Sequence, residues 1–153
     1  MQKKTTIILG SDHAGFNLKE SIKKHLEKLS YKYGDIGVFD DKPSDYPKIA
    51  FELALKVSSS DSKGILMCGT GIGECIVANK VKGIRAANCF DEYTAKMSRE
   101  HNDSNILCLG ARALSESAAK KIVKVWIETG FSTELRHSRR LKEISEIESK
   151  TMK

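Results

Sequence analysis

The stretch from Gly64 to Asn79, GILMCGTGIGECIVAN, constrains this chain more than any other part of its sequence. It begins as a short apolar run typical of a buried strand, passes through three glycines at alternate positions, and ends as a small-residue helical pattern. Glycines let a backbone turn sharply and aim several N–H groups at one point, and the first turn of a helix adds unpaired donors. The pattern predicts an anion-binding loop surrounded by the thiol of Cys68, the hydroxyl of Thr70 and the carboxylate of Glu74.

Two common types of glycine loop do not fit this stretch. A Walker loop requires Gly-Lys followed by Ser or Thr, and this loop ends in Gly-Glu. A dinucleotide-binding fingerprint spaces its glycines as G-x-G-x-x-G, whereas this loop reads G-x-G-x-G. Asp91 follows Gly73 by 18 residues and has the place of the ribose-binding acid of that fingerprint. The third glycine is nevertheless misplaced, so the sequence disfavours a nucleotide loop.

The composition is typical of one soluble globular domain spanning residues 1–153. The chain is 40% hydrophobic and 30% charged, and a chain of this length buries about two-thirds of its unfolded surface. No apolar stretch has the length of a membrane span and no signal peptide precedes the first strand, so we expect a cytoplasmic protein without a membrane partner. The net charge is +6, but lysines such as Lys19 and Lys23 alternate with acids on an apparently solvated helix face, which argues against a nucleic-acid partner.

The four cysteines, at positions 68, 75, 89 and 108, include no C-x-x-C pair and no closely spaced histidine. Neither a zinc site nor a disulfide framework is therefore expected. Cys89 and Cys108 lie inside apolar runs and are expected in the core. Cys68 differs because it ends its strand at the glycine turn.

Strand-like and helical patterns alternate five times along the chain. Strands are expected at 5–10, 31–37, 65–67, 85–90 and 106–110, and helices at 18–29, 45–58, 72–80, 91–101, 113–129 and 136–150. Residues 149–153 have the composition of a frayed, disordered polar tail. The pattern predicts an α/β fold with three layers, in which a five-stranded parallel Rossmann-like sheet carries helices on both faces and an extra C-terminal helix.

In such a sheet, ligands bind at the carboxyl ends of the strands, near the point where the strand order reverses. Asp12 and His13 follow the first predicted strand, the Cys68 loop follows the third, and Arg112 follows the fifth. All of these residues are expected at one edge. His101 ends a helix and must reach the site by another route.

Each of these residues also has a purely structural interpretation. A helix N-terminus lowers the pKa of a thiol, so Cys68 could act as a base or nucleophile, but it could equally be a buried apolar cysteine. Glu74 suits a helix start electrostatically, and Asp12 and His13 could simply form a turn. His101 is well placed to end a helix.

Arg136 and Arg140 are four residues apart and share one face of the predicted last helix. Cations at a helix start oppose the helix dipole, so a negative group is expected nearby. Glu143 could supply it by pairing with Arg139 or Arg140. A bound phosphate is the alternative, because guanidinium groups match phosphate in bidentate geometry.

Further motifs extend over nearly the whole chain, namely GSDHAG at 10–15, DYP at 45–47, CGTGIG at 68–73, ANK at 78–80, GIRA at 83–86, SREHND at 98–103, LGAR at 109–112, and RH at 136–137 with Arg140. With these motifs in this order, the chain resembles the B-type ribose 5-phosphate isomerases. That family also includes the two subunits of galactose 6-phosphate isomerase. The resemblance implies an aldose–ketose isomerase that works through an enediolate, without metal or cofactor, in the non-oxidative pentose phosphate pathway.

The resemblance also assigns roles to residues. It implies that Cys68 moves the proton between C1 and C2, while Thr70 and the backbone amides of the loop stabilise the charged oxygen of the intermediate. His101, helped by Asp12, would open the furanose ring. The remaining implied ligands of the substrate are Gly69, Gly71 and Gly73 through their amides, Asn102 near the sugar oxygens, and His13, Arg112, Arg136 and Arg140 at the phosphate.

Members of this family are homodimers or dimers of dimers whose active sites draw on two chains, which would bring His101 to a neighbouring glycine loop. Some members use a cysteine base and others a glutamate at the position of Glu74, whereas this chain has both residues. Two adjacent anions repel, so at most one of the two residues should carry the full negative charge during proton abstraction. We assign the base to Cys68, because a glutamate near a helix start is expected to be ionised already and a weak base. A hexose 6-phosphate isomerase acting on allose or galactose 6-phosphate, and a non-catalytic phosphosugar or nucleotide sensor, remain alternatives.

Overall fold

The computed structural model describes residues 4–152 and contains the expected five-stranded parallel sheet. Its strands, in chain order, are β1 (Ile7–Ser11), β2 (Tyr33–Asp35), β3 (Lys63–Cys68), β4 (Ala86–Asn88) and β5 (Ile106–Gly110). They lie in the order β2-β1-β3-β5-β4. The chain leaves β1 toward one side for β2 and returns to the other side for β3, so the strand order reverses at β1 and β3. This confirms the predicted fold class.

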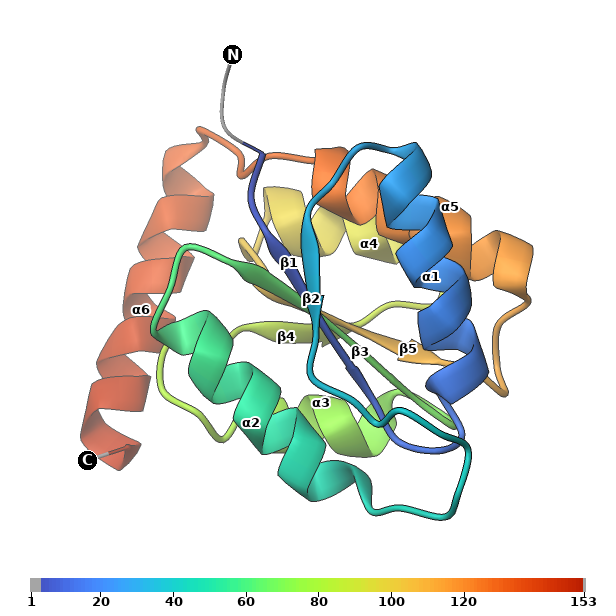
Figure 1. Cartoon of the computed structure of the whole chain (residues 1–153). Helices are drawn as coiled ribbons and strands as arrows, with labels where there is room; N and C mark the ends of the chain where they lie inside the picture. Colours follow the sequence, from blue (N-terminus) through green and yellow to red (C-terminus); the bar gives the residue numbers. More distant parts are fainter. Residues whose placement is uncertain (1–3, 153) are drawn as a thin grey trace.

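Helices cover both faces of the sheet (Figure 1). The helices are α1 (Phe16–Lys28), α2 (Tyr46–Ser58), α3 (Ile72–Ala78), α4 (Glu92–Glu100), α5 (Glu116–Glu128) and α6 (Leu135–Thr151). One core lies between the sheet and α1, α4 and α5, and a second lies between the sheet and α2 and α3. The central strand β3 is buried on both sides because both faces are covered, which explains its uninterrupted run of apolar residues.

Lys19 corrects the expectation of a fully solvated face on α1. Its side chain is completely buried, and its Nζ donates to Asp35 Oδ1 and to the carbonyl oxygen of Val38, both at 2.6 Å. Lys23 bonds the other oxygen of Asp35 at 3.0 Å. A buried ammonium is tolerated only where it is paired and hydrogen-bonded. This pairing fixes the start of the loop between β2 and α2.

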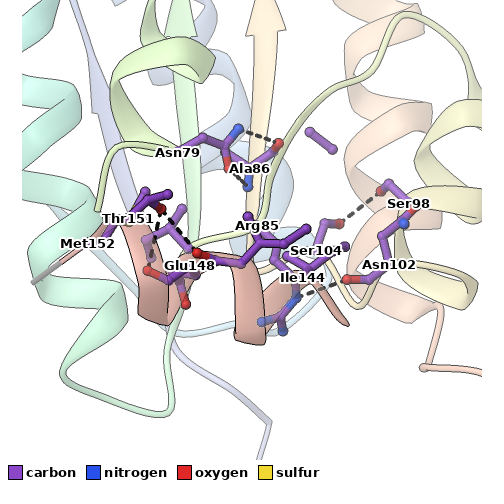
Figure 2. Close-up of a pocket in the computed structure, with 13 residues that line it drawn as sticks. Asn79, Arg85, Ala86, Ser98, Asn102, Ser104, Ile144, Glu148, Thr151 and Met152 are labelled. Carbon is purple, nitrogen blue, oxygen red and sulfur yellow. Dashed lines mark hydrogen bonds between the residues drawn. The ribbon is translucent and has the colours of Figure 1, made fainter. Parts of the chain in front are cut away.

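The outer strand β4 is protected by a side chain from α3. Asn79 donates from Nδ2 to the carbonyl oxygen of Ala86 at 2.9 Å and accepts from the Ala86 N–H at 2.8 Å, as Figure 2 shows. Both backbone groups of Ala86 that face away from β5 are therefore satisfied within the chain.

The last helix is longer than the sequence predicted. Residues 149–153 were expected to fray, but α6 continues through Thr151 and only Lys153 lies outside the described residues. The reason is tertiary contact: Glu148 accepts a 2.7 Å hydrogen bond from the backbone of Gly83, and Thr151 and Met152 line a cavity beside β4. Within residues 4–152, no helix combines the length and apolarity that a membrane crossing requires.

Candidate functional site

The glycine loop turns tightly at the carboxyl end of β3 and brings main-chain donors to a thiol. Cys68 lies opposite Gly110, the last residue of β5. The N–H of Gly71 donates to the Cys68 Sγ at 3.1 Å, and the N–H of Ile72 donates to the Thr70 hydroxyl at 3.3 Å. The thiol therefore sits at the start of α3, against the amide concavity that the sequence predicted.

Two glycines of this loop have no room for a side chain. Gly71 has a φ of +80°, and a methyl group built on it would lie 2.6 Å from the Oδ1 of Asn88. A methyl group built on Gly73 would lie 2.4 Å from the ring of Tyr46, at the first turn of α2. Tyr46 thus covers the loop. The sequence analysis listed this residue in the Asp-Tyr-Pro motif but did not predict its contact with the loop.

The electrostatics of Cys68 differ from the expectation. The thiol is 4% exposed, and burial, followed by the charge of Glu74, raises its pKa. The bonds from the Gly71, Thr70 and Glu74 amides act in the opposite direction but do not compensate. The predicted lowering by the helix start is therefore wrong, because desolvation outweighs it.

Glu74 was expected to be ionised at a helix start, but its surroundings disfavour the charged form. Its side chain is 0% exposed, and neither carboxylate oxygen has a hydrogen-bond partner among the described residues. Burial, and next the charge of Asp12, raise its pKa well above the ordinary value. An enclosed carboxyl group without donors is favoured in its neutral form.

Asp12 and His13 reach the same edge from the end of β1. Asp12 Oδ1 accepts from the Gly15 N–H at 3.0 Å, which fixes the turn before α1. The His13 N–H donates to the Ser44 hydroxyl at 3.0 Å, and the Ser44 N–H lies 3.1 Å from His13 Nδ1. When Nδ1 accepts this bond, Nε2 carries the proton and is available to donate to a ligand.

Arg112 completes the group of residues at this edge. Its backbone N–H donates to the Gly69 carbonyl oxygen at 2.9 Å. Its Nη1 would lie 3.1 Å from a methyl group built on Gly69, so the guanidinium extends over the loop. We refer to the residues at this edge as the loop cluster, which consists of Asp12, His13, Cys68, Thr70, Glu74 and Arg112.

The other predicted site residues lie elsewhere, around the start of α6. The rings of His101 and His137 meet edge to face, with centroids 4.2 Å apart. His137 is buried, and burial, followed by the charges of His101 and Arg136, lowers its pKa. Sequence reasoning included His137 in the Arg-His motif at 136–137 but assigned it no role. We refer to these residues as the helix cluster, which consists of His101, Asn102, Arg136, His137 and Arg140.

The arginines of the helix cluster remain largely available. Arg136 Nε bonds Glu134 at 2.7 Å on the surface. Glu143 lies 4.0 Å from Arg139, and within the described part of the chain Arg140 makes no ion pair. Arg140 is thus an exposed cation near His137.

The two clusters are far apart in one chain. His101 and Asn102 precede β5, whereas Cys68 is level with its last residue, so the length of β5 separates them. At about 3.3 Å per residue, this length is roughly 13 Å. Across residues 4–152, no group of three or more histidine, cysteine, aspartate or glutamate side chains could hold a metal ion.

The chain is similar to known sugar-phosphate isomerases. Residues 7–144 match the family model described as ribose/galactose isomerase. The ribose-5-phosphate isomerase B of Escherichia coli is 41% identical over 145 residues, which cover 94% of this chain and 97% of that protein. A D-erythrulose-4-phosphate isomerase of Pectobacterium atrosepticum is 40% identical over 132 residues, which cover 82% and 84%.

Solved structures extend this similarity to three dimensions. The ribose-5-phosphate isomerase B of Clostridium thermocellum is 46% identical, with a TM-score of 0.92 and coverage of 95% of this chain and 99% of that one. The ribose-5-phosphate isomerase B of Mycoplasma genitalium with bound ribulose-5-phosphate is 40% identical, with a TM-score of 0.92 and coverage of 98% and 100%.

Proposed function

This chain belongs to the ribose/galactose isomerase family, and we propose that it interconverts D-ribose 5-phosphate and D-ribulose 5-phosphate through an enediolate. The observation that carries the proposal is the thiol of Cys68, held 3.1 Å from a loop amide at the carboxyl edge of the sheet. A proton acceptor beside a cradle of amide donors is what proton transfer next to a carbonyl requires.

In the proposed reaction, the thiolate of Cys68 removes the proton from C2 of the open-chain aldose. The electron pair of the broken C–H bond forms the C1–C2 double bond, and the carbonyl oxygen becomes an oxyanion. Thr70 and the amides of Gly69, Gly71 and Gly73 stabilise that charge. The proton of the C2 hydroxyl passes to the oxyanion on C1, and the thiol returns its proton to C1. The C2–O bond thereby becomes the carbonyl of the ketose, and the thiolate is restored.

Glu74 supports the choice of Cys68 as the base. Neither oxygen of its enclosed carboxyl group has a hydrogen-bond partner within residues 4–152. The single negative charge of the pair is therefore better placed on sulfur, which accepts the Gly71 amide. We propose that Glu74 stays neutral while Cys68 transfers the proton.

The helix cluster is proposed to act on the loop cluster of a second copy. His101, with Asp12, would open the ring, Asn102 would bind the sugar oxygens, and Arg136 and Arg140 would hold the phosphate together with His13 and Arg112. A homodimer, or a dimer of such dimers, satisfies this requirement with two equivalent sites. Such pairing is supported by apolar side chains left in solvent on α3 and near the start of α4, namely Ile72, Ile76, Phe90 and Tyr93.

We further propose that the enzyme works in the cytoplasm, in the non-oxidative pentose phosphate pathway, and requires no cofactor. The proposed chemistry supports this, because the oxyanion is met by amide and hydroxyl donors of the protein itself.

A shorter sugar phosphate is a second candidate, because a relative named as a D-erythrulose-4-phosphate isomerase is 40% identical. Comparing kcat/KM for tetrose, pentose and hexose phosphates in the presence of a chelator tests the assignment. The highest value is expected for ribose 5-phosphate, with no loss on chelation. A higher value for a tetrose or hexose phosphate would replace the substrate, and no turnover of any of them would indicate a non-catalytic phosphosugar-binding protein.

A further inference from the structure

The turn that joins α4 to β5 is held by a side chain from a different part of the chain. Arg85, just before β4, donates from Nε to the carbonyl oxygens of Asn102 and Asp103 at 2.9 and 3.0 Å. Its Nη2 donates to the Asp103 carbonyl oxygen at 2.8 Å and to Asp103 Oδ2 at 3.1 Å. Figure 2 shows the Arg85 side chain extending toward Asn102. One guanidinium therefore binds two successive carbonyl groups of this turn.

A second arginine, Arg99, forms hydrogen bonds to the same turn from its buried side. Arg99 Nη1 bonds Asp103 Oδ1 at 2.8 Å and the Ser104 carbonyl oxygen at 2.6 Å. Asp103 has a φ of +45°, a conformation that a residue other than glycine keeps only where its surroundings enforce it. The Asp103 carboxylate, shared between Arg85 and Arg99, supplies that enforcement.

Arg85 is itself fixed at its backbone. The side chain of Asn105 accepts from the Arg85 N–H at 2.8 Å and donates to the Gly83 carbonyl oxygen at 2.8 Å, while the Asn105 N–H donates to the Arg85 carbonyl oxygen at 3.0 Å. The guanidinium thus reaches the turn from a rigid origin. Because its backbone is fixed, Arg85 can hold the turn in one position, which a mobile surface arginine would not do.

The two residues that this turn presents depend on it for their orientation. In the described part of the chain, the side chains of His101 and Asn102 make no hydrogen bond of their own. The His101 ring packs edge to face with the His137 ring, and Asn102 borders a cavity of about 410 Å³ that Arg85 also lines. Their directions are therefore set by the backbone that Arg85 and Asp103 hold.

We infer that Arg85 is a positioning residue for the isomerase reaction, which acts by fixing the turn that aims His101 and Asn102 at the substrate. The inference rests on the roles proposed above for His101 and Asn102. Lysine cannot replace arginine here, because a single ammonium group lacks the planar fork that reaches two carbonyls and a carboxylate at once.

The test compares Arg85→Gln and Arg85→Lys with the matched control Lys82→Gln, which removes an exposed charge from the same connection. We expect kcat for ribose 5-phosphate to fall about 10- to 100-fold in both Arg85 variants, the loss typical of a catalytic group displaced by about 1 Å. The control is expected to keep wild-type kcat. Imidazole resonances of the four histidines, followed by NMR, should move for His101 and stay in place for His13 and His25.

A mutant cycle in a background that carries both His101→Ala and Asn102→Ala separates positioning from general damage. If Arg85 acts through these two residues, Arg85→Gln adds at most about a twofold further loss in that background. Losses that multiply, or a wild-type kcat in both Arg85 variants, would overturn the inference while leaving the proposed function intact. Full activity of His101→Ala would instead remove the role of His101 on which the inference rests.

Discussion

Cys68 and His101 lie at opposite ends of the strands of one sheet: Cys68 is level with the last residue of β5, and His101 precedes its first. The length of β5, roughly 13 Å, lies between them, and no side-chain movement spans it. If both residues serve one reaction, they must come from two copies of the chain.

A mixing experiment tests this requirement. Cys68→Ala and His101→Ala should each be nearly inactive alone. After joint unfolding and refolding in equal amounts, half of the dimers are mixed, and each mixed dimer has one intact site, so about a quarter of the wild-type activity should return. Activity that stays at the level of the separate variants would contradict a shared site.

The identity of the base is tested by two substitutions in the loop cluster. Cys68→Ala is expected to lower kcat by about 10²- to 10⁴-fold, the range for loss of a general base. Glu74→Gln keeps the shape and the neutral state of the side chain and should retain most of the activity. Steady-state kinetics on ribose 5-phosphate decides the matter, and the reverse pattern would assign the base to Glu74.

The raised pKa of Glu74 predicts a dependence of stability on pH. A carboxyl group whose pKa is raised by folding favours the folded state while it is protonated, and this contribution is lost as the pH rises from the unfolded pKa through the folded pKa. Glu74→Gln does not titrate. The difference between the melting temperature of this variant and that of the wild type should therefore increase as the pH rises above 4.5, the ordinary pKa of glutamate.

Thermal unfolding of both proteins between pH 4 and pH 8 measures this gain. A difference in melting temperature that is independent of pH would mean that Glu74 is ionised in the folded protein.

The close approach of Tyr46 to Gly73 makes a small substitution costly. Gly73→Ala should lower both stability and kcat/KM, because its methyl group would overlap the Tyr46 ring. Gly34→Ala is the matched control, since no atom lies within 4 Å of its new methyl group. Adding Tyr46→Ala should recover part of the lost stability, and a purely additive result would show that the two residues do not press on one another.

Arg140 and Arg139 are neighbours with different expected roles. Arg140→Gln should raise KM for ribose 5-phosphate about 10- to 100-fold, the cost of one charge-assisted hydrogen bond to phosphate. Arg139 already faces Glu143, and Arg139→Gln should leave KM within about twofold, the scale of an exposed ion pair. Equal effects of the two substitutions would remove Arg140 from the phosphate site.

The sequence predicted the sheet because its central strands are continuous apolar runs, such as Ile65 to Met67, that end at glycines or polar turns. It also predicted the separation of His101 from Cys68, because a helix returns the chain to the opposite edge of a parallel sheet. Both inferences need only the order of elements along the chain.

Properties that depend on distant residues were not predictable in the same way. The raised pKa of Glu74 follows from enclosure and from Asp12, 62 residues earlier in the chain. The burial of Lys19 depends on Asp35, and the extension of α6 depends on Gly83. The local sequence pattern suggested that Lys19 is solvated, that Glu74 is ionised and that residues 149–153 fray. A local pattern does not indicate which distant residues pack against each position.

The amide of Asn79 supplies the two hydrogen bonds that a sixth strand would otherwise make to Ala86. The backbone of another copy of the chain therefore cannot hydrogen-bond to Ala86. Such pairing at an outer strand is the usual first step of sheet growth between molecules. Association at this side of the sheet is then left to side chains, whose fit can be selective, and at high protein concentration β4 should not seed fibrous aggregates.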